Sequence, residues 1–327
     1  MIFAVPGDLA APTGGYAYAR RVLELMPEHG IAMRHLALPG GYPHPSPEEL
    51  AETARRVADT TPDAVLFIDS LAFGAMPEDL VTGFGRRIVA LVHHPLAHET
   101  GLTPERQAEL LLSEARALAH ARRVVAASPL TGRLLAQEFG VPAERITVAE
   151  PGTDPAPRSR GTGAPVQLLT VGAVSPRKGY EILVRALAGL ADLDWRLTVA
   201  GATDRDPASV EALERAVAES GVAERIRLAG EVDDGTLEEL YDAADVFVSA
   251  SLFEGYGMVL AEAMARGLPL VASTGGAAAD TVSDAAALKV PPANGMRLRQ
   301  ALRRIIGDPN LRRRLADGSW AAGQRLP

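Results

Sequence analysis

The chain lacks cysteine altogether and is poor in lysine: only two of its 33 basic residues, Lys178 and Lys289, are not arginine. The absence of cysteine excludes disulfides, thiolate metal sites and cysteine nucleophiles. No apolar run approaches the roughly 18 residues of a membrane-spanning helix, and the apolar start at residues 1–5 is too short for a signal peptide. We therefore expect a cytoplasmic protein without a transmembrane segment.

An excess of positive charge is also lacking, since 33 basic residues stand against 41 acidic ones and the net charge is −8. Binding to a nucleic-acid backbone needs many surface cations, so nucleic acid is excluded as a partner. The chain does have an ordinary globular composition, 47% hydrophobic and 23% charged. Its 327 residues are about twice the usual size of a domain, which predicts two domains.

Short, β-branched apolar runs alternate with longer amphipathic stretches, a pattern typical of α/β domains with parallel sheets. The predicted strands of the first half are residues 2–5, 31–38, 64–69, 88–93, 123–127 and 145–149. Those of the second half are residues 167–171, 196–200, 225–229, 245–250, 269–272 and 286–290. Helices are predicted at 47–59, 104–121 and 129–139, where Ser46, Thr103 and Ser128 are the N-caps and a proline takes the first helical position.

Residues 150–165 have no helical or strand period and are dense in proline and glycine, which is typical of an interdomain linker. We therefore predict two Rossmann-like domains, residues 1–155 and 156–327. Open parallel sheets bind ligands at the carboxyl ends of their strands, so two such domains are expected to face one another across a binding cleft.

Two glycines, Gly14 and Gly15, lie between the first predicted strand and a helix predicted at residues 17–28. Glycines at such a turn let backbone amides approach a ligand closely, and a helix N-terminus favours an anion. The spacing matches neither the dinucleotide-binding fingerprint nor the P-loop. A tight turn without a ligand explains the pair equally well.

Three of the seven histidines, His93, His94 and His98, lie within six residues after a strand. His94 and His98 would share a face if the segment were helical, but no third ligand is evident, so we predict no metal site. A histidine at the carboxyl end of a strand is better suited to hydrogen bonding or acid–base work in the cleft. A solvated loop position stays open for His93 and His98.

Adjacent cations, Arg177 and Lys178, follow the first strand of the second half in the sequence PRKG. An arginine can contact a diphosphate through two hydrogen bonds and a lysine through a point charge, so the pair suits a diphosphate. A solvated turn is the alternative for this motif taken alone.

The most specific pattern is the run EGYGMVLAE from Glu254 to Glu262, which follows another predicted strand. A helix beginning near Met258 would leave free N–H groups at its start for a phosphate. The two carboxylates would flank this site and could accept hydrogen bonds from ligand hydroxyls. Two surface glutamates are the alternative, although Glu254 stands among apolar residues and glycines.

Together these motifs resemble the retaining family 4 glycosyltransferases of the GT-B architecture, also described as glycosyl transferases group 1. The resemblance rests on EGYGMVLAE, on PRKG at 176–179 and on TGGY at 13–16, with support from the sequence TGG at 274–276. It implies transfer of a sugar, of hexosyltransferase type, from a nucleotide diphosphate sugar to an acceptor with retention at the anomeric carbon.

The family pattern implies a role for four catalytic residues. Glu254 would contact hydroxyls of the donor sugar, and Arg177 and Lys178 would neutralise the diphosphate leaving group. His94 corresponds best to the family's first-domain histidine near the donor sugar, with His93 as the alternative. The residues expected to bind the donor are Gly14, Gly15, Gly257, Met258, Val259 and Glu262, the last through the nucleotide ribose.

No metal or other cofactor is implied beside the donor substrate, and Asp233 with Asp234 is more simply a helix cap than a metal clamp. Residues 1–155 carry 13 arginines against 19 acidic residues, a net charge of −6, which favours a soluble acceptor over a lipid. In the family a last helix crosses back to the first domain, whereas this chain ends at Pro327.

Many relatives have arginine after the glycine that begins the phosphate turn, where this chain has Ala173. This departure keeps a non-catalytic GT-B partner that binds a nucleotide sugar as an alternative. A sugar-nucleotide epimerase or a phosphorylase on the same architecture is the other.

Overall fold

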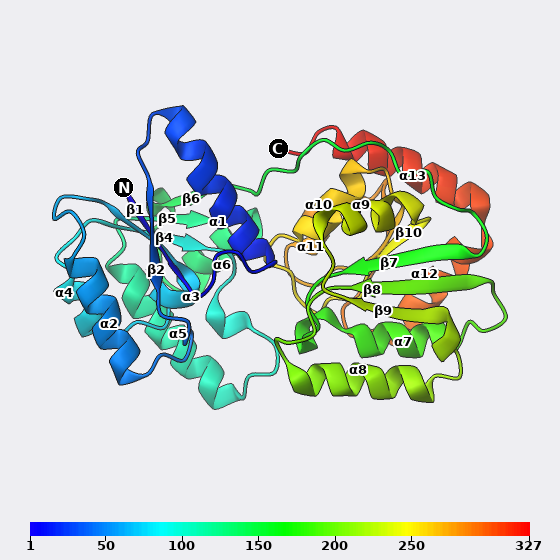
Figure 1. The fold of residues 1–327 in the computed structure, drawn as a ribbon, viewed down its shortest axis with the longest axis horizontal. Helices are drawn as coiled ribbons and strands as arrows, with labels where there is room; N and C mark the ends of the chain where they lie inside the picture. The colour runs from blue at the N-terminus through cyan, green and yellow to red at the C-terminus, as the bar shows by residue number, and fades with distance from the viewer. The chain divides into compact units, whose positions relative to one another are not determined.

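The computed structural model describes residues 1–327, which form two compact units, Met1–Pro151 and Gly152–Pro327 (Figure 1). The stretch from 149 to 163 contains no helix or strand. The division between the units falls within it, and so does the boundary predicted after residue 155. No helix in residues 1–327 combines the length and the apolar character that a membrane crossing needs.

The first unit is built on a six-stranded sheet in the order β2-β1-β3-β4-β5-β6, with every neighbouring pair parallel. Its strands are β1 (Ile2–Pro6), β2 (Arg34–Leu38), β3 (Leu66–Asp69), β4 (Ile88–Val92), β5 (Arg123–Ala126) and β6 (Ile146–Val148). Every residue of β1 and β3 is buried, as continuous apolar runs in a parallel sheet covered on both faces should be.

The helices of the first unit cover both faces of this sheet. They are α1 (Gly14–Leu25), α2 (Pro47–Ala58), α3 (Ser70–Phe73), α4 (Glu78–Gly83), α5 (Pro104–Ala119) and α6 (Pro129–Gln137), with 3-10 turns η1 (Met26–His29), η2 (Leu96–His98) and η3 (Ala143–Arg145). The predicted caps are confirmed, because the side chains of Ser46, Thr103 and Ser128 each accept a backbone N–H of the first turn.

The helix predicted at 17–28 begins earlier than the sequence indicates, at Gly14. Thr13 is its N-cap, and the Thr13 hydroxyl accepts the N–H of Tyr16 at 3.3 Å. Gly14 and Gly15 therefore lie in the first helical turn rather than in a loop before it, where their N–H groups have no intrahelical acceptor.

The second unit repeats the plan with a parallel sheet in the order β12-β11-β10-β7-β8-β9. Its strands are β7 (Val166–Val171), β8 (Trp195–Ala200), β9 (Ile226–Gly230), β10 (Val246–Ser249), β11 (Leu270–Ser273) and β12 (Ala287–Val290). Its helices are α7 (Tyr180–Ala188), α8 (Pro207–Glu219), α9 (Asp234–Ala243), α10 (Met258–Ala265), α11 (Ala278–Thr281), α12 (Gly295–Gly307) and α13 (Pro309–Gly323), with 3-10 turns η4 (Pro176–Lys178) and η5 (Ala223–Arg225).

Two apolar clusters fill the second unit, one on each face of the sheet. The cluster under α7, α8 and α12 contains the fully buried Trp195. The cluster under α9, α10 and α13 contains Tyr241 and Phe247. Figure 1 shows α7 and α8 on one side of the strands and α9 and α10 on the other. The cap expected at Asp233 is confirmed, since its side chain accepts the N–H of Thr236 at 2.8 Å.

Each sheet has one place where the order of its strands reverses. In the first unit β1 lies between β2 and β3, and in the second unit β7 lies between β8 and β10. The connections on the two sides of such a strand run to opposite faces, which opens a crevice at the carboxyl ends of the strands. The residues that follow β1 and β3, and those that follow β7 and β10, therefore occupy the positions where open α/β sheets bind ligands.

Candidate functional site

The turn after β7 carries the two predicted cations and is held tightly against the end of β10. Gly179 ends η4 in the left-handed region, with φ +62°, and a Cβ at this position would lie 2.4 Å from the carbonyl oxygen of Ala250. The Lys178 side chain crosses close to Gly172, where an added Cβ would lie 2.7 Å from the lysine Cε. The sequence PRKG thus forms a short 3-10 turn whose glycine permits the close approach.

Glu254 lies on the loop after β10, and the two glycines of the TGG sequence fix the backbone of this loop. The N–H of Glu254 donates to Gly275 O at 3.1 Å, and its own carbonyl accepts the N–H of Ala277 at 2.7 Å. A Cβ on Gly275 would lie 2.1 Å from Leu252 O, and one on Gly276 would lie 2.3 Å from Glu254 O. Only glycine leaves room here, so the TGG sequence positions the glutamate.

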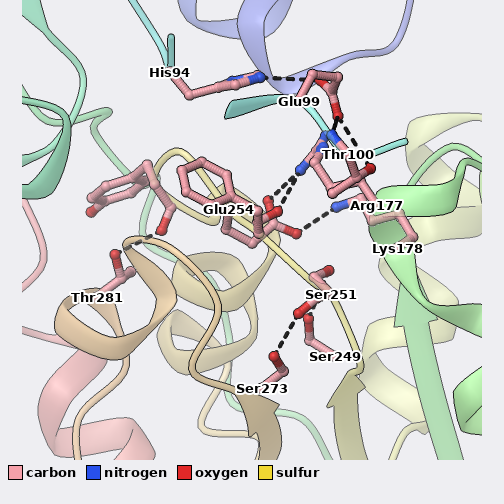
Figure 2. A network of polar contacts seen from close by, with 12 residues as sticks. His94, Glu99, Thr100, Arg177, Lys178, Ser249, Ser251, Glu254, Ser273 and Thr281 are labelled. Atoms are coloured by element: carbon pink, nitrogen blue, oxygen red, sulfur yellow. Dashed lines mark hydrogen bonds and ion pairs between the residues drawn. The ribbon is translucent and has the colours of Figure 1, made fainter. Parts of the chain in front are cut away.

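The Glu254 carboxylate is held between the two cations. Its Oε1 accepts from Lys178 Nζ at 2.8 Å, and its Oε2 accepts from Arg177 Nη1 at 3.0 Å. Figure 2 shows both cationic side chains directed at this carboxylate, which is 5% exposed. The three predicted residues therefore meet beyond the carboxyl ends of β7 and β10, the two central strands of the sheet, although 76 positions of sequence separate Lys178 from Glu254.

Two opposing effects set the protonation of Glu254. Burial would raise its pKa, but the charges of Lys178 and Arg177, with hydrogen bonds from Lys178 and Ser251, lower the pKa to about 2. Glu254 is consequently an ionised carboxylate at neutral pH. It can accept hydrogen bonds or stabilise positive charge, but it cannot serve as a proton donor.

Buried serines that sequence reasoning missed support the Glu254 loop from below. Ser249 donates to the hydroxyl of Ser251 at 3.2 Å, and Ser273 donates to the Ser251 carbonyl at 2.5 Å (Figure 2). The N–H of Leu252 donates to Arg177 O at 2.7 Å, which ties the loop to the cationic turn. The one signal in the sequence was the recurrence of serine at the ends of two apolar strands.

Helix α10 begins where the sequence places it, at Met258. Gly257 is the N-cap with φ +95° and offers no side chain to the first turn. The N–H groups of Gly257, Met258 and Val259 therefore stand at a helix N-terminus, where they and the helix dipole favour an anion. Thr281 donates to Tyr256 O at 2.7 Å and anchors the chain just before this helix.

Glu262 lies one helical turn after Met258, the first residue of α10. Its Oε2 accepts from the hydroxyl of Tyr241 at 3.0 Å. Burial raises the pKa of Glu262, while the hydrogen bond from Tyr241 and the charge of Arg266 act in the opposite direction. Neither Tyr241 nor Arg266 was singled out from the sequence.

In the first unit, the glycine pair lies beside a histidine at the carboxyl ends of the strands. A Cβ on Gly15 would lie 3.5 Å from the imidazole of His93, which follows β4 directly. His93 Nε2 is 3.1 Å from Oδ2 of Asp69, the buried last residue of β3, and the ring of Tyr18 packs edge-on against it at 5.4 Å.

The neighbouring histidines have other partners. His94 Nε2 lies 3.1 Å from Oε2 of Glu99, and Figure 2 shows these two side chains turned toward one another. His98 Nε2 lies 2.8 Å from Oε2 of Glu138. His94, which the family pattern favours, is thus turned toward Glu99, whereas the alternative His93 is the one at the glycine pair. No group of three or more histidine, aspartate or glutamate side chains within residues 1–327 is arranged to hold a metal ion.

Comparison with known families accounts for nearly the whole chain. Residues 158–319 match the model described as Glycosyl transferases group 1, and residues 8–157 match that of Glycosyltransferase Family 4. The chain belongs to the family 4 glycosyltransferases. The resemblance drawn from EGYGMVLAE, PRKG and TGGY is therefore confirmed.

Among curated family members, the D-inositol 3-phosphate glycosyltransferase of Xylanimonas cellulosilytica is 31% identical over 244 residues, which cover 69% of this chain and 58% of that protein. The mannosylfructose-phosphate synthase of Agrobacterium fabrum is 28% identical over 171 residues, or 47% of this chain and 38% of that protein. The matched region thus spans less than two thirds of the length of these relatives.

Solved glycosyltransferase structures share the fold. The sucrose-phosphate synthase of Thermosynechococcus elongatus matches with a TM-score of 0.83 at 23% identity, covering 100% of this chain and 94% of the other. The Anabaena protein HepE, solved in complex with UDP-glucose, matches with a TM-score of 0.77 at 19% identity, covering 100% and 95%. These matches and the two parallel sheets confirm the predicted α/β GT-B fold.

Proposed function

We propose that this family 4 glycosyltransferase transfers a sugar from a nucleotide diphosphate sugar to an acceptor, with retention at the anomeric carbon. The observation that carries the proposal is the buried carboxylate of Glu254 between Arg177 and Lys178, at the strand-order reversal of the second sheet. Ionised groups of both signs are concentrated there beside the N-terminus of α10, which is what a charged, hydroxyl-rich ligand requires.

The cations and the helix amides would act on the leaving group. Cleavage of the bond between sugar and phosphate builds negative charge on the diphosphate, and donors fixed in advance stabilise that charge in the transition state. Arg177, Lys178 and the N–H groups of Met258 and Val259 are the donors in this role. Because two protein cations can neutralise a diphosphate, we propose that transfer requires no metal ion, and activity should persist in the presence of EDTA.

Glu254 would act on the sugar. Held ionised by its neighbours, it can accept hydrogen bonds from sugar hydroxyls and stabilise the positive charge that develops on the ring during bond cleavage. Glu262 would accept hydrogen bonds from the ribose of the nucleotide. Retention is proposed on the resemblance to the retaining family, and NMR of the product anomer tests it.

In the first unit, we propose that Gly14 and Gly15 contribute amides to phosphate binding and that one histidine assists at the donor sugar. The family pattern favours His94, while the contacts with Gly15 and Asp69 favour His93. The net charge of −6 over residues 1–155 supports a soluble acceptor.

Thermal-shift titration of the purified chain with UDP, GDP and ADP tests the proposal, because a ligand that binds only the native state raises the unfolding midpoint. One of the three should raise it, and Lys178→Ala should abolish the increase. Lys289→Ala is the matched control, since it removes the other lysine, which contacts Asp284 and Ala279 instead. If all three nucleotides shift the unfolding midpoint equally, and by the same amount in wild type and Lys178→Ala, the assignment of Lys178 to the nucleotide site is wrong.

Ala173 favours a second candidate, a chain that binds nucleotide sugars without turning them over. It lacks the arginine that many relatives carry at this position of the turn. Donor binding without release of nucleoside diphosphate over a broad panel of acceptors would select this second candidate.

A further inference from the structure

Helices α9 and α10 share a polar cluster that consists of Glu238, Tyr241, Glu262 and Arg266, with Tyr241 buried and Glu238 exposed. Tyr241 is 1% exposed, and its ring stacks on Phe247 of β10 with centroids 6.0 Å apart and planes 17° from parallel. The Arg266 guanidinium lies 4.4 Å from the centre of the same ring. The tyrosine ring is therefore held by the core and by a cation, and its orientation is fixed before any ligand binds.

The hydrogen bonds of this cluster converge on Glu262. Tyr241 Oη donates to Glu262 Oε2 at 3.0 Å, and Arg266 Nη1 donates to the Glu262 backbone carbonyl at 3.1 Å. Arg266 in turn forms an ion pair with Glu238, one helical turn before Tyr241 on α9. Within residues 1–327, the tyrosine hydroxyl is the hydrogen-bond partner found for the Glu262 carboxylate, which leaves Oε1 available to a ligand.

The protonation state of Tyr241 suits its hydrogen bond to Glu262. Burial, and then the nearby charge of Glu262, raises the pKa of Tyr241 well above its ordinary value, so its hydroxyl keeps its proton at neutral pH and can donate it to Glu262. A carboxylate that receives one fixed donor loses rotational freedom about its last bond. The remaining oxygen is thereby aimed in advance, and this reduces the entropy lost when a second donor binds.

We infer that Tyr241 is a positioning residue: it fixes the Glu262 carboxylate so that the free oxygen accepts hydrogen bonds from the ribose hydroxyls of the nucleotide. Discrimination between ribonucleotides and nucleotides without ribose hydroxyls then depends on a side chain that does not itself touch the ligand. This inference rests on the proposed function, which supplies the nucleotide. It goes beyond that function by naming the residue that sets the specificity of Glu262.

A structural role in the core is the alternative, and Tyr241→Phe separates the two, because phenylalanine keeps the ring and its packing and removes one hydrogen bond. Tyr42→Phe is the matched control. Tyr42 is likewise buried and shares a side-chain hydrogen bond of 3.0 Å with Thr53, but it lies in the first unit.

The experiment measures the Kd of the preferred nucleoside diphosphate among UDP, GDP and ADP, and of its 2′,3′-dideoxy derivative, by titration calorimetry. Wild type and Tyr42→Phe should bind the ribonucleotide at least tenfold more tightly than the dideoxy compound. Tyr241→Phe should weaken ribonucleotide binding by about five- to tenfold, the effect of one hydrogen bond, and leave binding of the dideoxy compound unchanged. Glu262→Gln should reduce the same discrimination.

Three results would overturn the inference, and they differ from one another. If Tyr241→Phe weakens both ligands equally, the tyrosine has only a structural role. If Glu262→Gln removes the discrimination while Tyr241→Phe leaves it intact, the positioning role fails but the proposed function stands. If the wild-type chain binds none of the three nucleotides, or does not distinguish the dideoxy compound, the assignment of Glu262 to the ribose fails and the inference fails with it.

Discussion

Lys178 Nζ lies 2.8 Å from Glu254 Oε1, and this ion pair joins the turn after β7 to the loop after β10. Both side chains are largely buried, with side-chain exposures of 12% and 7%. A pair removed from water in this way exists only where further bonds repay the cost of desolvation, and Arg177 provides them on the other carboxylate oxygen. In the free chain, the cations proposed for the diphosphate thus already hold an internal anion.

Glu254→Gln should therefore change stability and nucleotide affinity in opposite directions. Loss of the carboxylate charge leaves the largely buried Lys178 ammonium without the anion that it contacts, and we expect the free energy of unfolding to fall by about 2–4 kcal/mol. The Lys178 ammonium then becomes available to a diphosphate, so the Kd of the diphosphate should decrease while kcat falls at least 100-fold. Urea denaturation, calorimetry and a transfer assay measure the three quantities. An unchanged kcat would show that Glu254 has no catalytic role.

The Lys178–Glu254 pair is itself measurable with a double-mutant cycle. Lys178→Met keeps most of the side-chain volume, and Glu254→Gln keeps the shape of the carboxyl group. Residues in direct contact show interaction energies between roughly 0.5 and 3 kcal/mol, and the burial of this pair predicts a value in the upper half. Lys289→Met with Glu254→Gln is the control, because Lys289 contacts Asp284 instead, and its two effects should add.

Gly179→Ala should destabilise the second unit more than an ordinary substitution of glycine. A residue with a Cβ is sterically strained at a φ of +62°. The added Cβ would also lie 2.4 Å from Ala250 O, so either the cationic turn or the end of β10 must move. Gly140→Ala is a matched control, with φ +66° and no atom within 4 Å of the added Cβ. We expect a loss of about 1 kcal/mol at Gly140 and at least twice that at Gly179. Equal losses in thermal or urea unfolding would show that the turn has room to relax.

The strands and the motifs of the candidate site were predictable because they depend on local patterns. Runs of four to eight residues predicted all twelve strands, although the strand predicted at 31–38 begins at Arg34, since η1 closes at Gly30 with φ +76°. The sequences PRKG and EGYGMVLAE contain Arg177, Lys178 and Glu254, the charged groups that the structure brings together. What they could not predict is that these groups pair, because contacts between residues 76 positions apart depend on strand order.

The choice between His93 and His94 shows a second limit of sequence reasoning. Adjacent residues at the end of a strand point in opposite directions, and nothing in the run LVHHPL says which one faces Gly15. In the structure His93 faces Gly15, and its partner Asp69 ends a different strand, β3. In the same way, Tyr241 is an ordinary helical tyrosine in the sequence, and only the crossing of α9 and α10 places it on Glu262.

His93→Ala should reduce transfer far more than His94→Ala. His93 is held by Asp69 and lies against Gly15, whereas His94 lies beside Glu99. A positioned hydrogen-bonding or acid–base group typically contributes a factor of about 10²–10⁴ to the rate, so we expect kcat/KM to fall by at least 100-fold for His93→Ala and by less than fivefold for His94→Ala. The reverse order of effects would restore His94 as the family's histidine. Asp69→Asn should lower the rate as well, because it disturbs the orientation of the His93 ring.

The raised pKa of Glu114 should make the stability of the chain depend on pH. This residue of α5 is 1% exposed, and its Oε2 accepts the N–H of Ala97 at 3.1 Å, at the turn that follows the histidines. Burial raises its pKa from 4.5 to about 7, although hydrogen bonds from Leu96 and Ala97 act in the opposite direction. The folded chain therefore binds this proton more tightly than the unfolded chain does. Its contribution to stability is complete below pH 4.5 and is lost as the pH rises to about 7.

At 1.36 kcal/mol for each unit of pKa difference, the loss across that range amounts to about 3 kcal/mol. Glu114→Gln keeps a carbonyl oxygen for Ala97 and cannot titrate. Urea denaturation of both proteins between pH 5 and 8 should therefore show the wild type losing stability relative to the variant, with no further change above about pH 8. The comparison cancels the titration of all other groups. Parallel curves for the two proteins would mean that Glu114 is already ionised at pH 5, and that the turn from Pro95 to Glu99 closes over a charged carboxylate.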